Sequence, residues 1–302
     1  MEHVIKTERL TKRFGKEVVV NELNMRVPKG EVYGFLGPNG AGKSTTIRML
    51  LGLMKPSAGM VQIFHQDLKS GRLNILKKVG SLVENPSYYP HLTAYENLEA
   101  IRKILGVPEA RIEEVLDIVR LADAANKKVK NFSLGMKQRL GIAASLLHHP
   151  DLLILDEPTN GLDPSGIIEI RELIKRLPAE YGMTIFISSH LLSEIEQIAT
   201  TVGIISKGKL IFQDSIEVLR KMAQQRILLK ASDSERAWRT LLSKGMKADF
   251  KDGFVSLANA SDETVADAVR ILVENGFSIY RVEEEKSSLE DIFLQMTKEG
   301  AA

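Results

Sequence analysis

The sequence predicts an α/β protein in which a layered domain built on a parallel sheet is followed by a smaller α+β domain. Short aliphatic runs closed by polar residues, DLLILDEP (151–158) and MTIFISSH (183–190), are typical of parallel strands covered on both faces. They alternate with segments of helical spacing, which favours an α/β layered architecture. After about residue 220 the pattern changes to strand, helix, two strands, helix and strand.

Composition excludes several kinds of site. The 302 residues include no cysteine, which removes disulfides, thiolate nucleophiles and cysteine–zinc sites and fits a reducing cytosol. We expect no secretory signal in MEHVIKTERL and no membrane span, because the apolar runs are far shorter than about 20 residues. The net charge of +2 is too balanced to indicate a nucleic-acid partner, and we interpret KKVK (127–130) as a solvated stretch.

The elements of the first part follow in order. EVYGFLG (31–37) reads as a strand entering a glycine loop, and STTIRMLLGL (44–53) as a buried helix. VGIISKGKLIFQD (202–214) predicts a hairpin that turns at Lys207-Gly208. Between these, residues of about 86–150 predict a mostly helical insert, with helices over 92–105, 110–125 and 136–149. Thr93 and Glu96 fit a capping box.

The last part, residues 221–302, predicts a small ferredoxin-like domain. We expect strands at RILLKA, KADF, FVSLA and FSIYRVEEE, and helices at SERAWRTLLSKG, DETVADAVRILVENG and SLEDIFLQMTKE. The domain contains no histidine, no obvious metal cluster and no obvious nucleophile. Its role is open between docking, dimerisation, regulation and ligand binding, and docking that steadies a dimer is favoured.

A phosphate-binding loop lies between the first predicted strand and helix. It fits the pattern G-x-x-x-x-G-K-[ST] in full, over Gly37, Pro38, Asn39, Gly40, Ala41, Gly42, Lys43 and Ser44. The glycines let backbone N–H groups turn toward phosphate oxygens, and the helix presents its positive end to the same anion. Lys43 is then expected to contact the β- and γ-phosphates, and Ser44 to ligate Mg²⁺.

Two carboxylates follow the next buried strand. Asp156 emerges at the carboxyl edge of the strand, where sites of α/β sheets lie and where it could orient the metal. Glu157 comes directly after it and could act as general base for an attacking water. Alone, this run could be an ordinary strand end; together with the phosphate loop it indicates nucleotide hydrolysis.

With these residues in place, the sequence resembles the ATP-binding cassette family over residues 1–220. The motifs occur in family order: GPNGAGKST (37–45, thus including Thr45), FSLGMKQR (132–139), LLILDEP, NGLD (160–163) and ISSH (187–190). The resemblance implies ATP and Mg²⁺ as ligands. It also implies a homodimer in which each ATP lies between the phosphate loop of one copy and the signature of the other.

The resemblance also assigns further residues, each with an ordinary structural alternative. Ser133 and Gly135 resemble the signature that binds ATP in trans, although Ser133 alone could be a helix cap. Asp163 resembles the aspartate linking the two sites, and His190 resembles the histidine that contacts the γ-phosphate. Phe14 resembles the aromatic residue that stacks on adenine, the alternative being core packing.

Two positions depart from the family pattern. Leu134 adds a side chain where the signature usually has glycine. Glu84, in GSLVENPSYYP, falls where a glutamine usually contacts the metal and the attacking water; a carboxylate can still ligate Mg²⁺, and the alternative is an exposed loop residue.

These departures and the ending SLEDIFLQMT resemble the exporters for bacitracin resistance and lantibiotic self-immunity. That narrower resemblance implies an ATP-hydrolysing subunit that powers export of a drug or an antimicrobial peptide through separate transmembrane permease subunits. This chain would then be cytoplasmic and peripheral on the inner face of the cell membrane. The alternative function is a soluble nucleotide-dependent switch in DNA repair or translation. A single phosphate loop and no sustained heptads disfavour it.

Overall fold

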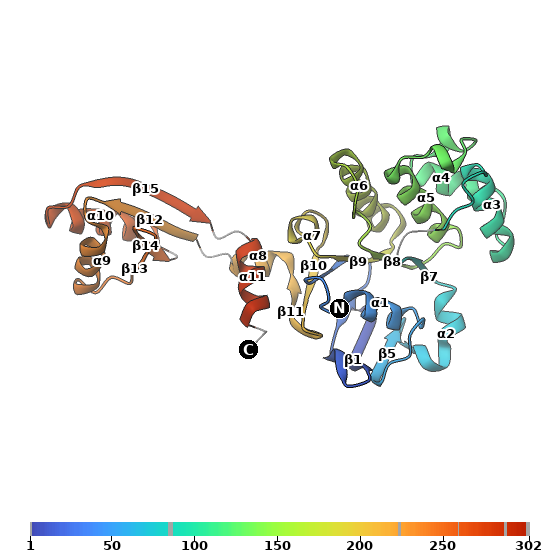
Figure 1. Ribbon diagram of the computed structural model, residues 1–302, viewed down its shortest axis with the longest axis horizontal. Coiled ribbons are helices and arrows are strands. Elements are labelled where there is room, and N and C mark those ends of the chain that lie inside the picture. The colour runs from blue at the N-terminus through green and yellow to red at the C-terminus, as the bar shows by residue number, and fades with distance from the viewer. Residues whose placement is uncertain (1, 84–86, 223–224, 259, 287–288, 300–302) are drawn as a thin grey trace. The chain divides into compact units, whose positions relative to one another are not determined.

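The computed structural model describes all residues except 1, 84–86, 223–224, 259, 287–288 and 300–302. They form two compact units (Figure 1). Among the described residues, the first unit contains 2–216 and 296–299, and the second contains those between Glu217 and Gln295. Within the described residues, no helix combines the length and the apolar character needed to cross a membrane.

A six-stranded sheet forms the centre of the first unit. Its strand order is β11 (Lys209–Ser215), β10 (Thr201–Ser206), β4 (Val32–Leu36), β9 (Thr184–Ser189), β8 (Leu152–Asp156) and β7 (Val79–Leu82). All neighbours are parallel except β11, which turns back from β10 at Lys207 and Gly208. Every residue of β4 and β9 is buried, as expected for strands covered on both faces.

A second, antiparallel sheet was not predicted from the sequence. It contains β2 (Glu17–Leu23), β1 (His3–Phe14), β5 (Ala58–Ile63) and β6 (Gln66–Asp67), with β3 (Arg26–Pro28) paired to β1. One apolar core joins this sheet, helix α1 (Lys43–Leu50) and the central sheet, through residues such as Ile5, Ile63, Ile47, Phe35 and Phe186. This packing holds α1 at the carboxyl edge of β4.

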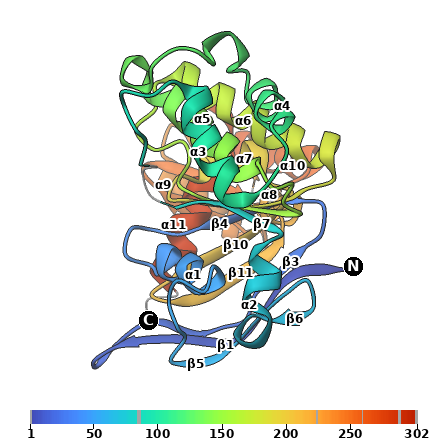
Figure 2. The ribbon, with the colours of Figure 1, turned by 90° about the vertical axis from the view of Figure 1, so that its right-hand side faces the viewer.

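Further helices cover the face of the central sheet that points away from α1 and the second sheet, as both Figure 1 and Figure 2 show. Three of them lie in the chain between β7 and β8: α3 (Ala94–Leu105), α4 (Ala110–Ile118) and α5 (Leu134–Leu146), with short 3-10 turns at Ala122–Ala124 and Val129–Asn131. The others are α6 (Pro164–Tyr181) and α7 (Leu192–Ile198), while α2 (Leu68–Leu76) packs near β5 and β6. Thr93 caps α3 in the predicted capping box.

The helix expected over 110–125 is shorter than predicted. It ends at Ile118, and Arg120 has a left-handed backbone with φ of 55°. The guanidinium of Arg139, in α5, donates to the carbonyl oxygens of Val119 and Arg120 at 3.2 and 3.0 Å. In a longer helix these carbonyl oxygens would accept from N–H groups of the next turn. Because Arg139 donates to them instead, α4 can end early.

The second unit is an antiparallel sheet with its own core. The chain passes through α8 (Ile216–Met222), β12 (Gln225–Ala231), α9 (Ser234–Ser243), β13 (Asp249–Lys251), β14 (Phe254–Ala258), α10 (Asp262–Glu274), β15 (Ile279–Lys286) and α11 (Leu289–Glu299). The strand order is β13-β14-β12-β15. Leu229, Leu241, Val255, Leu257 and Leu272 are fully or almost fully buried in this core.

Candidate functional site

The loop after β4 is shaped by glycines at its two ends. A Cβ on Gly37 would lie 2.4 Å from the carbonyl oxygen of Ile205, so only glycine fits there. Gly42 has φ of +106°, and its Cβ would lie 2.8 Å from the carbonyl oxygen of Val19. Between them, Pro38, Asn39 and Gly40 are exposed. The backbone therefore curls tightly at the start of α1, where Ala41 is buried and Ser44 and Thr45 follow Lys43 in the first helical turn.

Lys43 is a buried cation at the start of α1. Its side chain is only 5% exposed. The ammonium donates to the carbonyl oxygens of Gly37 at 2.8 Å and Pro38 at 3.4 Å, and lies 3.3 Å from Oε1 of Glu157. A buried charge is stable only when it is hydrogen-bonded and paired, and these contacts meet that requirement.

The end of β8 is fixed by a serine of the neighbouring strand. The buried Ser188 hydroxyl donates to Oδ1 of Asp156 at 2.6 Å and accepts from the backbone N–H of Glu157 at 3.0 Å. Glu157 has φ of 48°, a strained conformation for a non-glycine residue. This turn directs the Glu157 carboxylate toward Lys43 on one side and His190 on the other.

His190 follows directly after β9. Its Nδ1 lies 3.2 Å from Oε2 of Glu157, and its side chain is one-third exposed. Glu157 thus bridges Lys43 and His190 through its two oxygens. Three polar side chains from separate parts of the chain meet here because β4, β9 and β8 are parallel neighbours whose carboxyl ends share one edge.

A groove of about 540 Å³ opens at this edge of the sheet. It is lined by Ser44, Asp156 and Glu157 together with Leu134, Gln138, Asn160 and Gly161. Hydroxyl and carboxylate oxygens of Ser44 and Asp156 are the hard donors that Mg²⁺ prefers. The arrangement can therefore hold a phosphate chain with its metal ion beside the Glu157 carboxylate.

Other predicted residues lie outside the lining of this groove. The Ser133 hydroxyl accepts from the Met136 N–H at 3.2 Å and caps α5, which also contains Gly135. Asp163 caps α6 by accepting from the Gly166 N–H at 3.0 Å. Phe14 is 48% exposed, with the Lys12 ammonium 5.1 Å from its ring centroid, so core packing is not its role. Glu84 lies outside the described residues.

Sequence reasoning missed several residues of the site. Ser188 lies in the quoted run ISSH, but its contact with Asp156 depends on the pairing of β8 with β9. Gln138 and Asn160 line the groove. Gln138 could have been found, because it follows Leu134 by four residues on α5 and so shares its face.

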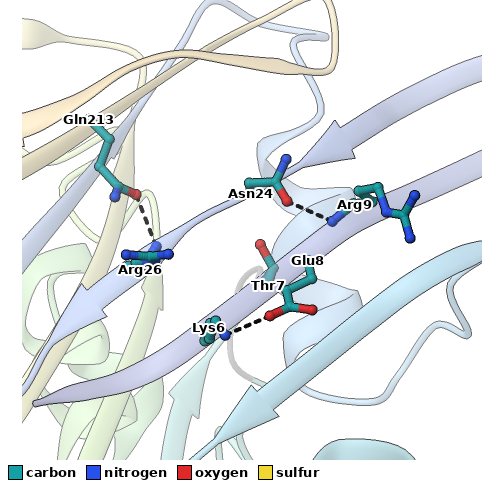
Figure 3. A pocket seen from close by; sticks show the side chains of 7 residues that line it. All are labelled: Lys6, Thr7, Glu8, Arg9, Asn24, Arg26 and Gln213. Atoms are coloured by element: carbon teal, nitrogen blue, oxygen red, sulfur yellow. Dashed lines mark hydrogen bonds and ion pairs between the residues drawn. The ribbon is translucent and has the colours of Figure 1, made fainter.

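A separate groove of about 520 Å³ lies on β1 and β3 (Figure 3). Lys6 pairs with Glu8, and the side-chain oxygens of Asn24 and Gln213 accept from the backbone N–H groups of Arg9 and Arg26. None of the candidate site residues lines this groove, and we assign no role to it.

Comparison with known proteins identifies the family. A family profile described as "ABC transporter" matches residues 20–160. The chain is 44% identical to the bacitracin transport ATP-binding protein BcrA of Enterococcus faecalis, over 99% of this chain and 98% of that protein. The chain belongs to the ABC transporter family. As an ATP-binding subunit of that family, it is an ATPase.

Further relatives agree with this family. The ABC transporter chain is 45% identical to BcrA of Bacillus licheniformis, over 99% of both chains. It is 47% identical to the lantibiotic transport ATP-binding protein SrtF of Streptococcus pyogenes, over 75% of this chain and 99% of that protein. The solved structure of cbiO1 from Clostridium perfringens, part of the ABC transporter complex cbiONQ, matches with a TM-score of 0.67 and 28% identity, over 74% of this chain and 95% of that one. The α/β cassette fold is thus shared.

Proposed function

We propose that this chain is the ATP-hydrolysing subunit that powers export of an antimicrobial peptide through separate membrane permease subunits. The observation that carries the proposal is its similarity, over essentially the whole chain, to two bacitracin transport ATP-binding proteins. The similarity to a lantibiotic transport protein extends the proposed substrate class to lantibiotics. These relatives are named as transport proteins, which favours a role in transport over a switch in DNA repair or translation.

The geometry supports a division of labour within the site. Lys43 would exchange its Glu157 contact for the β- and γ-phosphates of ATP. Glu157 would then accept the proton of the attacking water, and His190, 3.2 Å from it, would orient the γ-phosphate. Ser188 holds Asp156 and the Glu157 backbone during these steps.

Magnesium is the metal that this site fits. Ser44 and Asp156 would hold it together with phosphate oxygens, and the ion would neutralise charge that develops on the phosphates. Glu84 remains a predicted third ligand. A Glu84→Gln variant keeps an oxygen that can ligate the metal and removes the charge, so unaltered ATPase activity and transport would remove any special role for the carboxylate.

We also infer a homodimer. Ser133 and Gly135 lie at the N-terminus of α5, whose free N–H groups and positive end can bind phosphate oxygens of an ATP held by a second copy. Asp163 would link the two sites, and the exposed ring of Phe14 is accessible for stacking on adenine. Each site is then completed by the other copy.

Residues 1–220 would form the cassette, with a helical subdomain at about 86–150. Residues 221–302 would form an accessory domain that steadies the dimer. The order and antiparallel pairing of β12 to β15 support a ferredoxin-like fold for it, while residues 296–299 belong to the first unit. The chain would lie on the cytoplasmic face of the membrane, held there by the permease. A nucleic-acid partner is not expected, given the balanced charge.

Complementation tests the export function. A host strain that lacks this gene would be complemented with the wild type or with Lys43→Ala, and the growth-inhibiting concentrations of bacitracin and of a lantibiotic measured. Export predicts that only the wild type restores resistance to at least one of the two peptides. Equal restoration by both forms would contradict an ATP-powered role, and restoration by neither would contradict the substrate class.

A further inference from the structure

Glu194 is a buried carboxylate that the steps above do not use. It lies in α7, four residues after His190 in the chain, and is only 7% exposed. Among the described residues, no Lys, Arg or His side chain pairs with it, and its donors are two hydroxyl groups. Burying a carboxylate is costly unless it is well hydrogen-bonded, so this position needs a reason.

The two hydroxyl donors come from the turn after Glu157 and from the last residue of β9, next to His190. Oε2 of Glu194 accepts from Oγ1 of Thr159 and from Oγ of Ser189, both at 2.8 Å. Thr159 is two residues after Glu157, and Ser189 immediately precedes His190. Both hydroxyl-bearing residues are themselves buried. One oxygen atom therefore connects the turn after Glu157 to the end of β9, next to His190.

The His190 turn is tied further by the same hydroxyl. Oγ of Ser189 also accepts from the backbone N–H of Leu191 at 3.0 Å. Glu194, Thr159, Ser189, Glu157 and His190 all line one small cavity of about 210 Å³. Glu194 is thus bonded to residues next to Glu157 and next to His190. The described contacts of Glu194 include none with the phosphate loop.

We propose that Glu194 is a positioning residue that fixes the distance between Glu157 and His190 during ATP hydrolysis; this rests on the roles proposed above for those two residues. Removal of the carboxylate would leave two buried hydroxyl groups without their acceptor, and the two loops would lose their common anchor. A displacement of about 1 Å at reacting groups lowers turnover roughly 10- to 100-fold.

Positioning and a merely structural role predict different kinetics. ATP binding depends on Lys43 and the phosphate loop, so a positioning defect lowers kcat and leaves KM nearly unchanged. The charge of Glu194 is not required, because both hydroxyls donate to the same atom and the amide oxygen of glutamine has two lone pairs. Glu194→Gln should therefore recover activity that Glu194→Ala loses.

The experiment measures steady-state ATP hydrolysis by the full chain, well below the melting temperature of each variant. For Glu194→Ala we expect kcat to fall roughly 10- to 100-fold with KM within about threefold of wild type. Glu194→Gln should exceed the alanine variant at least about fivefold, and the exposed Ser193→Ala on the same helix should match wild type. Thr159→Val, which removes one of the two bonds at constant shape, should lie between wild type and Glu194→Ala.

A wild-type kcat in Glu194→Ala, a KM that rises in step with the loss of kcat, or a glutamine variant as slow as alanine would overturn the proposal. If Glu194→Ala does not fold, a wild-type kcat in Thr159→Val overturns the proposal instead. Glu157→Gln is measured in parallel. An inactive Glu157→Gln beside a normal Glu194→Ala overturns only the role of Glu194, whereas a normal Glu157→Gln overturns the proposed catalytic role as well.

Discussion

Lys43 and Glu157 form an ion pair with each other in this structure. The ammonium lies 3.3 Å from the carboxylate in a largely buried setting, so the phosphates of ATP must compete with Glu157 for the same cation. We expect ATP to win this competition because it brings several negative charges to the exposed N–H groups of the loop. Once Glu157 leaves Lys43, its carboxylate is available to accept a proton beside His190.

Replacement of Lys43 by alanine tests this residue-scale picture. The variant loses charge-assisted hydrogen bonds to phosphate that contribute about 1.5–3 kcal/mol each, so ATP affinity should fall roughly 10- to 100-fold or more. Titration with a fluorescent ATP analogue measures it. Lys175→Ala, an exposed lysine on α6, serves as the control and should bind normally. Unchanged affinity in Lys43→Ala would contradict the assignment of the phosphate loop.

At the scale of elements, the capping box of α3 is a local feature with a measurable energy. Thr93 Oγ1 accepts from the Glu96 N–H at 3.1 Å, and the Glu96 carboxylate accepts from the Thr93 N–H at 2.7 Å, which holds the pKa of Glu96 below its usual range. Thr93→Ala should lower the free energy of unfolding by about 1 kcal/mol, and Thr93→Ser by much less. Urea unfolding measures both; equal losses would show that the hydroxyl is not the stabilising group.

His148 joins the end of α5 to the central sheet and makes stability pH-dependent. Its Nε2 lies 3.2 Å from the carbonyl oxygen of Val79 in β7, and burial lowers its pKa below the usual 6.5. The unfolded chain therefore takes up a proton at this position more readily than the folded chain. The associated stability is present above about pH 6.5 and is lost as the pH falls through the lowered folded value.

The urea midpoint of unfolding should therefore decrease between about pH 7.5 and about pH 5.5, and urea titrations at the two pH values measure this decrease. The decrease should be smaller in His148→Gln than in wild type, whereas the exposed His91→Gln should behave as wild type. An identical decrease in all three proteins would show that His148 does not contribute to the pH dependence.

The elements show what could be predicted from sequence and what could not. β4, β8 and β9 were predictable because burial on both faces makes them continuous apolar runs. The antiparallel sheet was not, because β1 contains bulges around Arg9 and Thr11 that interrupt the alternation of buried and exposed residues. α4 was predicted too long because the Arg139 contact that ends it comes from another helix.

The site divides in the same way. The meeting of Lys43, Glu157 and His190 could be anticipated, since motifs after parallel strands share one edge of a sheet. Ser188 and Glu194 could not, because their contacts depend on strand pairing and on how α7 packs.

At the scale of the whole molecule, the two units have separate apolar cores. SrtF is matched over 99% of its length by only 75% of this chain, which indicates that a shorter chain can fold as an ATP-binding subunit. We therefore expect a chain truncated after residue 222 to bind ATP within about threefold of the full chain.

The truncated chain should form the ATP-dependent dimer less readily, since the proposed steadying domain is missing. The deletion also removes the hydrogen bond from Ser206 to the Thr297 carbonyl, worth about 1 kcal/mol. Analytical ultracentrifugation with ATP compares the two chains. Unchanged dimerisation and turnover would contradict the docking role of residues 221–302.

Turnover by the Glu157→Gln variant of the full chain tests the central claim most directly. The amide keeps the size of the side chain but cannot accept a proton, so we expect ATP to bind, an ATP-bound dimer to accumulate and kcat to fall by at least about 100-fold. Hydrolysis within about threefold of wild type would contradict the assignment of Glu157 as general base, and with it the mechanism built on this site.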